Sequence, residues 1–294
     1  VVRCEQEKAI PLLDTACSFL GEIDDEGNCV FQDNPIRIHL LDERKRATDL
    51  LYARHPLFYP LTVSHSQEST DHRKFNLVIL STNTDMAHAT WLIRQAFWLL
   101  PHYTVSVDST ITVLSPHYKE LAHIVTTLCP GLSTFITYDN TTPDTLPENF
   151  PVKIDDINFP KIDFCNLRLT STRDLENIVE TKVHDNELLY YIVDGTSDLE
   201  AINLGIRIRE VSIRETLRRK ILKKYIPGEN VIAVRCDNPD YANLSKQLIV
   251  PKEEEHDNRW FNDYKLISYG SVQELFSWDE LIGGQIEFMS ECMH

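Results

Sequence analysis

The sequence predicts an α/β protein with a doubly wound, mostly parallel β-sheet and helices on both faces. Short apolar runs of strand length alternate with longer amphipathic runs of helix length from residue 75 onward. The first run, 77–80, is apolar at every position, as expected for a strand buried on both faces of a parallel sheet. A chain of 294 residues has room for one large domain of this kind or two ordinary ones.

The residues before this alternation are predicted to form a separate N-terminal segment. A polar turn at 21–28 would join two short strands, of which the second is 29–31. A helical pattern at 36–55 stops before Pro56, and the polar stretch 64–74 is typical of a linker. We therefore predict a division into 1–70 (short strands, helix and linker) and 71–294 (the α/β domain with a C-terminal strand and helix).

The α/β region follows one pattern from element to element. Its first helix, 86–100, has an apolar face that includes Met86, Ala89 and Ile93. A loop rich in Pro, Asp and Asn covers 138–160. Strands are predicted at 77–80, 111–114, 133–137, 164–167, 188–193, 231–235, 266–268 and 274–276, and helices at 86–100, 116–128, 173–181, 198–224, 241–247 and 280–292.

The turn after the first strand is the first candidate site. Strand, short turn and helix form the opening unit of a Rossmann-like, dinucleotide-binding fold, in which the helix N-terminus offers N–H groups to an anion. Here no glycine is present, so a Cβ at each position obstructs the approach of a pyrophosphate, and Asp85 adds like charge. We predict a degenerate nucleotide site. Its candidate residues are Ser81, Thr82, Asn83, Thr84, Asp85 and Met86.

Two further strand ends belong to the same candidate site. The second strand ends at Ser115 without the acid that usually holds a ribose. Ser115 could bind a ribose or phosphate, or it could cap a helix that has Pro116 at its first position. Asp194, Gly195 and Thr196 follow a later buried strand. They could form a ligand-facing edge or a tight turn with a helix cap, and both interpretations stay open.

No catalytic or metal-binding motif accompanies these loops. The HExxH, GxSxG and Walker patterns are absent, and His88 is interpreted as a surface or capped histidine. Seven cysteines contain no CxxC pair, which argues against structural zinc. Cys129, Cys165 and Cys236 are predicted to be reduced core residues, and we therefore expect a cytoplasmic protein.

The charge distribution excludes some partner classes. A net charge of −16 argues against nucleic acid and anionic membrane surfaces. The basic stretch 207–224 is interpreted as a solvated helix face, with an anion or partner site as the alternative. No apolar run is long enough to span a membrane, and 1–20 does not have the pattern of a signal peptide. Because the chain starts without Met, we expect a trimmed chain, and a membrane module upstream is compatible with that.

With these residues in view, the chain resembles the Rossmann-type regulatory domains of the TrkA-N kind, the regulators of potassium conductance. The order of elements also resembles bacterial proteins in which such a domain precedes a ryanodine-receptor-type repeat. The resemblance covers roughly 36–294. It rests on the unit 75–100, on the strand, acidic turn and Asn-containing helix at 193–204, on Arg54-His55-Pro56-Leu57, and on the tail segments 269–275, 281–287 and Met293-His294.

This resemblance implies a cytoplasmic ligand-sensing or scaffold domain, often dimeric, coupled to a channel or another effector module. The family's phosphate-loop glycines fall on Ser81, Asn83 and Met86, and its ribose acid falls on Ser115. Our first hypothesis is a non-catalytic regulatory domain that acts as a homodimer, with NAD(P) or another nucleotide as the candidate ligand. The alternatives are a nicotinamide-dependent oxidoreductase with atypical cofactor binding and a purely structural dimerisation module.

Overall fold

A computed structural model describes 22–23, 29–30, 42–58, 60, 74–103, 108–138, 153–154, 157–169, 172–182, 187–221, 230–241 and 264–276. The chain divides into two compact units, Val1–Glu43 and Arg44–His294. The linker on which the predicted boundary at 70 rests lies largely outside the described residues, so that boundary stays a prediction. The predicted helices at 241–247 and 280–292 lie outside them too, apart from Tyr241.

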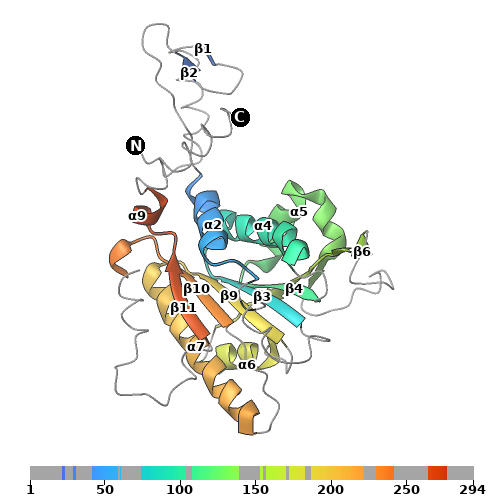
Figure 1. Cartoon of the computed structure of the whole chain (residues 1–294), viewed down its shortest axis with the longest axis vertical. Coiled ribbons are helices and arrows are strands. Elements are labelled where there is room, and N and C mark those ends of the chain that lie inside the picture. The colour runs from blue at the N-terminus through green and yellow to red at the C-terminus, as the bar shows by residue number, and fades with distance from the viewer. Residues whose placement is uncertain are drawn as a thin grey trace. The chain divides into compact units, whose positions relative to one another are not determined.

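The second unit is built on a parallel sheet, which confirms the predicted Rossmann-like, doubly wound α/β fold (Figure 1). The described residues give it seven strands in the order β11-β10-β9-β3-β4-β8-β5, and every neighbouring pair is parallel. The strands are β3 (Lys74–Ser81), β4 (Ser109–Ser115), β5 (Ile136–Tyr138), β8 (Lys161–Asn166), β9 (Glu187–Asp194), β10 (Asn230–Arg235) and β11 (Tyr264–Tyr269).

Helices cover both faces of this sheet, as the alternation predicts (Figure 1). Along β3, the side chains of Leu77 and Ile79 enter one apolar core, and those of Val78 and Leu80 enter the other. The first core is closed by α2, α4 and α5, and the second by α6 and α7. The helices are α2 (Glu43–Arg54), α4 (Ala87–Tyr103), α5 (Tyr118–Leu128), α6 (Thr172–Lys182), α7 (Asp198–Ile221) and the short α9 (Val272–Leu275).

Helix α2 completes the first face although it precedes every strand of the sheet in sequence. Its residues Ala47, Leu50 and Leu51 lie in the same core cluster as Ile267 of β11 and Val231 of β10. The helix is therefore part of the sheet's packing. No helix in the part of the chain that the structure describes is long and apolar enough to cross a membrane.

Two predicted strands are wrong in whole or in part. The run 133–137 begins inside a 3-10 helix, η3 (Pro130–Phe135), and only its last residues belong to β5. Proline at the start of η3 favours the helical turn. The run 274–276 is not a strand, because 272–275 form α9, and Ser271 caps this helix by accepting the N–H of Glu274 at 3.3 Å. Short apolar runs do not distinguish strand from helix by periodicity.

Among the described residues, two short antiparallel strand pairs are separate from the main sheet. β1 (Glu22–Ile23) and β2 (Cys29–Val30) pair antiparallel. β2 confirms part of the strand predicted at 29–31, whereas β1 lies inside the segment 21–28 that was predicted as the turn. β6 (Lys153–Ile154) and β7 (Ile157–Asn158) form the second pair, within the segment predicted as loop.

Candidate functional site at the carboxyl edge of the sheet

The strand order reverses between β3 and β9. The chain leaves β3 toward β4 on one side, whereas β9 leads to β10 and β11 on the other. Ligands of doubly wound folds bind beyond the carboxyl ends of the strands at such a switch point. Here the two strand ends are Ser81 and Asp194, which are partners in the β3–β9 register. The fold thus brings together two of the sequence-predicted site loops.

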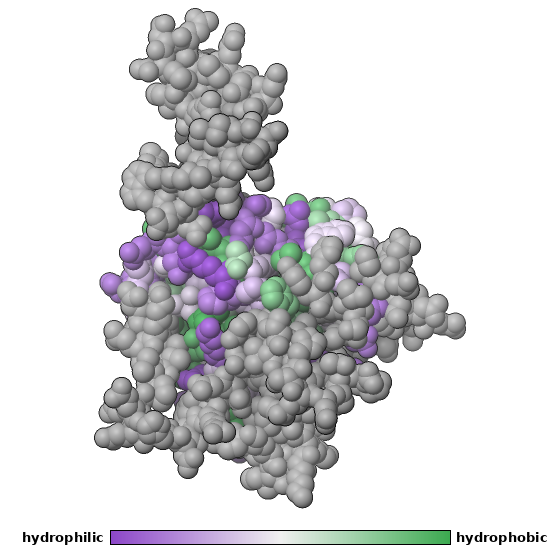
Figure 2. All heavy atoms as spheres, in the orientation of Figure 1, coloured by the Kyte–Doolittle hydropathy of each residue, from purple (hydrophilic) through white to green (hydrophobic). Residues whose placement is uncertain are grey.

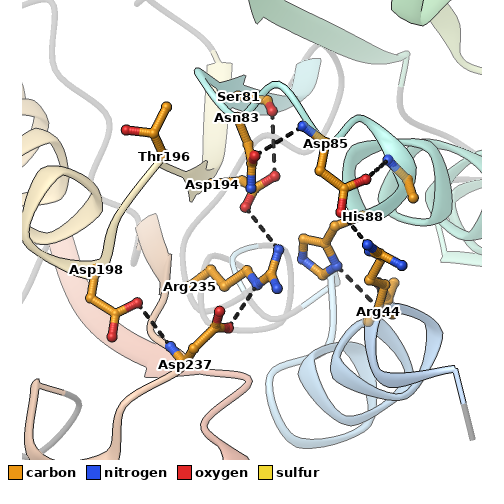
Figure 3. Close-up of polar contacts among 12 residues, drawn as sticks. Arg44, Ser81, Asn83, Asp85, His88, Asp194, Thr196, Asp198, Arg235 and Asp237 are labelled. Carbon is orange, nitrogen blue, oxygen red and sulfur yellow. Dashed lines mark hydrogen bonds and ion pairs between the residues drawn. The ribbon is translucent and has the colours of Figure 1, made fainter. Parts of the chain in front are cut away.

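Asp194 is the centre of this edge (Figure 3). Its carboxylate is fully buried and accepts a hydrogen bond from Ser81 Oγ at 3.3 Å. Arg235, the last residue of β10, donates from Nη1 to Asp194 Oδ1 at 3.2 Å. The backbone N–H of Thr82 donates to the carbonyl oxygen of Asp194 at 3.0 Å. The ends of β3, β9 and β10 are therefore joined by polar contacts among their own residues.

Burial dominates the electrostatics of the carboxylate. It raises the pKa of Asp194 to about 6, although the charge of Arg235 and hydrogen bonds from Arg235, Asn83 and Ser81 act in the opposite direction. Burial lowers the pKa of Arg235, but Asp194 and Asp237 raise it by more, so that it is raised overall. The pKa of each residue is thus raised, but for different reasons. Burial raises that of Asp194, whose side chain is fully enclosed, and neighbouring carboxylates raise that of Arg235, whose side chain is 18% exposed.

The glycine-free turn after β3 closes the N-terminus of α4 with its own side chains. Asn83 Oδ1 accepts the N–H of Asp85 at 3.0 Å, and Asp85 Oδ1 accepts the N–H of Ala87 at 3.2 Å. The other carboxylate oxygen of Asp85 is paired with the Arg44 guanidinium of α2 (Figure 3). The Asp85 carboxylate therefore lies where a Rossmann-like fold offers its helix N-terminus to a phosphate.

The turn after β9 is capped in a similar way. Glu200 Oε2 accepts the N–H of Thr196 at 2.8 Å and also contacts its hydroxyl. Asp198 accepts two backbone N–H groups from the turn after β10, those of Asp237 at 3.0 Å and Asn238 at 2.8 Å. The Glu200 contacts are those of a tight turn, one of the two interpretations that the sequence left open, whereas the Asp198 contacts join this turn to the turn after β10.

Gly195 has a steric role in this turn. A Cβ there would lie 2.8 Å from the backbone nitrogen of Ala201 and 3.0 Å from the carbonyl oxygen of Ser197. Only glycine allows β9 to approach the first turn of α7 so closely.

The remaining predicted site residues, Ser115, Thr84 and Met86, are not among the hydrogen-bond or ion-pair partners of Asp194. Ser115 is buried at the end of β4, and its hydroxyl accepts the N–H of His117 at 3.1 Å. The N-cap of α5 is His117 and not Ser115, which corrects the capping interpretation by two residues. Thr84 is exposed, and Met86 is half-buried against the first core. The assignment of any of these residues to a ligand stays a prediction.

His88 was interpreted as a surface or capped histidine, and this is wrong. The ring is fully buried, with Nδ1 3.2 Å from the carbonyl oxygen of Arg44 and Nε2 3.0 Å from the hydroxyl of Tyr269. Because a carbonyl only accepts, Nδ1 carries the proton and Nε2 accepts from Tyr269. Burial, and then the charge of Arg235, hold the pKa of His88 well below its usual value. The imidazole is therefore neutral and joins α2, α4 and β11.

Sequence reasoning missed four residues of this edge: Arg44, His88 as a buried link, Arg235 and Tyr269. Arg235 ends the predicted strand 231–235 and Tyr269 directly follows the predicted strand 266–268, which is the one signal that could have placed them at the carboxyl edge. Two described arginines of the basic stretch on α7 form ion pairs, Arg214 with Glu176 of α6 at 2.9 Å and Arg218 with Glu215 at 3.2 Å.

Three of the seven cysteines have side chains that the structure describes as free thiols. Cys165 and Cys236 are buried free thiols, and Cys129 is a half-buried one against the first core, as predicted. Among the described residues, no group of three or more His, Cys, Asp and Glu side chains could hold a metal ion. Comparisons of the chain with protein-family models, with curated proteins and with solved structures give no match.

Proposed function

We propose that this chain is a non-catalytic regulatory domain of Rossmann-like fold with a degenerate nucleotide site. The observation that carries the proposal is the Asp85 carboxylate at the N-terminus of α4, bonded to Ala87 N–H and paired with Arg44. A dinucleotide bound in the usual manner would have to displace this carboxylate with its pyrophosphate. It would also have to break the Asp85–Arg44 pair.

The charges of the neighbouring turn support the same proposal. Asp198 accepts backbone N–H groups from the turn after β10, and Glu200 accepts the N–H of Thr196, so carboxylates also lie at this second helix N-terminus, that of α7. Two carboxylates repel a third anion at short range. The edge therefore disfavours phosphate at both of its helix starts.

Regulation suits this edge because its contacts join separate elements. Asp194 and Arg235 join β9 to β10, and His88 joins α2, α4 and β11. A ligand or partner with different affinity for two arrangements of these elements would shift their populations. We propose that the domain acts in this way within a larger channel-linked or signalling protein. A cytoplasmic homodimer is part of the proposal, which on this point rests on the sequence resemblance.

Calorimetry tests this function. Titration of the purified chain with NAD, NADH, ATP and cyclic nucleotides is expected to show no saturable binding of a dinucleotide up to about 1 mM. Native mass spectrometry is expected to show no retained dinucleotide and to report the subunit number. Asp85→Gly removes both the carboxylate and the Cβ from the start of α4, so it is the variant in which dinucleotide binding should first appear. A cofactor that co-purifies with the wild type, or turnover of a substrate, would overturn the proposal.

A further inference from the structure

Helix α4 has two unlike faces. One face is buried in the first core and includes Ile93 and Phe97. On the opposite face, a row of side chains spaced three, four and seven residues apart lines up along one side of the helix. We call this row the tryptophan stripe, and its members are Trp91, Arg94, Gln95 and Trp98.

Trp98 gives the stripe a large apolar surface. Among the large hydrophobic side chains of the described residues it is the most exposed, at 59%. Its ring nevertheless packs edge-on against two neighbours, with 5.3 Å between its centroid and that of Phe97 and 6.4 Å to that of Phe159. A ring that is already held in place loses little conformational entropy when a partner covers it. Tryptophan and arginine are also the residue types that dominate the binding energy of protein interfaces.

The polar groups of the stripe leave a cation without a carboxylate. Arg94 stacks on the Trp91 ring, with 4.7 Å between its guanidinium carbon and the ring centroid. Within the described ranges no carboxylate is paired with Arg94, and its Nε has no hydrogen-bond partner. Beside it, Gln95 donates to Asp49 of α2, whose side chain is 35% exposed. The stripe therefore presents an unpaired guanidinium next to a partly exposed carboxylate.

The stripe is nearly symmetric about its own centre. Tryptophans lie at its two ends, and Arg94 and Gln95 lie side by side between them. If two such helices pack antiparallel about a twofold axis at that centre, each Trp91 lies level with a Trp98 of the other copy. Each Arg94 then lies level with a Gln95, beside which Asp49 is held. The cation and the carboxylate of one stripe thus meet the carboxylate and the cation of the other.

Charge also favours this place for a contact between copies. The chain has a net charge of −16, so two copies repel one another in general. At the stripe, two cations lie on the Trp91 ring, because Lys45 Nζ is 5.9 Å from its centroid in addition to Arg94, whereas Asp49 contributes one carboxylate. Figure 2 shows hydrophilic residues over the region of α2, with pale and hydrophobic ones among them over the region of α4.

We propose that a second copy of this chain docks on the tryptophan stripe, with the two α4 helices antiparallel about a twofold axis between Arg94 and Gln95. This inference rests on the homodimer of the proposed function and gives it an interface. Trp91 and Trp98 of the two copies cover one another at both ends of the contact. Arg94 of each copy pairs with Asp49 of the other.

Sedimentation equilibrium of the full chain tests the interface. The wild type is expected to form dimers at about 100 μM, and Trp98→Ala is expected to raise the Kd of the dimer at least about tenfold. The matched control is Leu199→Ala, at a side chain that is 55% exposed on α7, which covers the other face of the sheet. It should change the Kd by no more than about twofold. An unchanged circular dichroism spectrum shows that each variant is folded.

A charge exchange tests the twofold pairing itself. Arg94→Glu sets two carboxylates against each other in its own dimer, and Asp49→Lys sets two cations against each other, so each variant alone should dimerise at least about tenfold more weakly. A mixture of the two variants restores opposite charges at both contacts. Native mass spectrometry of the mixture is therefore expected to show the heterodimer in excess over either homodimer.

Two results would overturn the interface. One is a dimer whose Kd is the same in Trp98→Ala as in the wild type, and the other is a mixture of Arg94→Glu and Asp49→Lys without an excess of heterodimer. A wild type that stays monomeric at about 100 μM would remove the homodimer of the proposed function together with this interface. The degenerate nucleotide site is tested separately, because it is read from nucleotide titration and turnover.

Discussion

Asp194 and Arg235 end two neighbouring parallel strands and form an ion pair there, with 3.2 Å between Asp194 Oδ1 and Arg235 Nη1. The carboxylate is fully buried, and the guanidinium also lies 3.2 Å from Asp237 Oδ1 through its Nε. Burying two charges costs free energy that their attraction offsets only when the geometry is good. Removal of one partner is therefore expected to cost far more than the pair itself contributes.

Arg235→Met is predicted to destabilise the fold by about 3–5 kcal/mol at pH 7, because it leaves the Asp194 carboxylate buried without its cation. Urea unfolding measures the free-energy change. Arg214→Met is the matched control, since Arg214 pairs with Glu176 at the surface and its loss should cost no more than about 1 kcal/mol. Equal losses in the two variants would contradict the buried pair.

The stability of the protein should carry a pH dependence that belongs to Asp194. The pKa of Asp194 is about 6 in the folded state against an ordinary value of 3.8, so the folded state binds this proton more tightly than the unfolded chain does. The resulting stabilisation is fully present below the unfolded pKa and is lost as pH rises through 6. Between pH 7 and pH 5 the contribution of Asp194 is expected to increase by about 1 kcal/mol.

Asp194→Asn isolates this contribution, because asparagine does not titrate and every other group stays in place. Urea unfolding of wild type and variant at pH 5, 6 and 7 should show the free-energy difference between them changing over that window. A constant difference would mean that the pKa of Asp194 is not raised.

Tyr269→Phe is predicted to destabilise the fold by about 1–3 kcal/mol, because it removes the donor to His88 Nε2 and leaves that nitrogen buried and unpaired. Tyr241→Phe is a control at an exposed tyrosine, where a change within about 0.5 kcal/mol is expected.

Nitrogen NMR of the His88 imidazole provides a second readout. In the wild type it should show protonated Nδ1 and a ring that stays neutral well below pH 6.5. An imidazolium form of His88 just below pH 6.5 would contradict the neutral, Nδ1-protonated ring.

The order and type of the elements could be predicted because their signal is local. Strands buried on both faces read as apolar runs, and the helices between them keep an apolar face. The errors fall where a run is too short for a period to show, at η3 and α9. Ser81, Asn83, Asp85 and Asp194 could be singled out for a related reason, since each follows or ends a predicted strand and such ends gather at one edge of a parallel sheet.

The partners of these residues could not be predicted, because they depend on strand order. Arg235 reaches Asp194 only because β10 lies beside β9, and Tyr269 reaches His88 only because the end of β11 lies close to the start of α4. A single histidine in an amphipathic helix gives the same local signal whether it is exposed or fully buried. In the sequence, Arg44 likewise has the pattern of a solvent-exposed helix residue, because its partner Asp85 is distant along the chain.

Gly195→Ala provides the last test, because it probes the close approach of β9 to α7. The added Cβ would lie 2.8 Å from the nitrogen of Ala201 and 3.0 Å from its Cβ. Since the nearest atom belongs to the backbone, it cannot move aside without shifting the capped turn. We expect the free energy of unfolding, measured in urea, to fall by about 1–3 kcal/mol.

Gly131→Ala is the matched control at an exposed position of η3, where a new Cβ meets nothing within 4 Å. There the substitution should be neutral or stabilise by up to about 1 kcal/mol, because it restricts the unfolded chain. Opposite signs at the two glycines would support the capped turn, whereas a neutral Gly195→Ala would show that α7 does not begin so close to the end of β9.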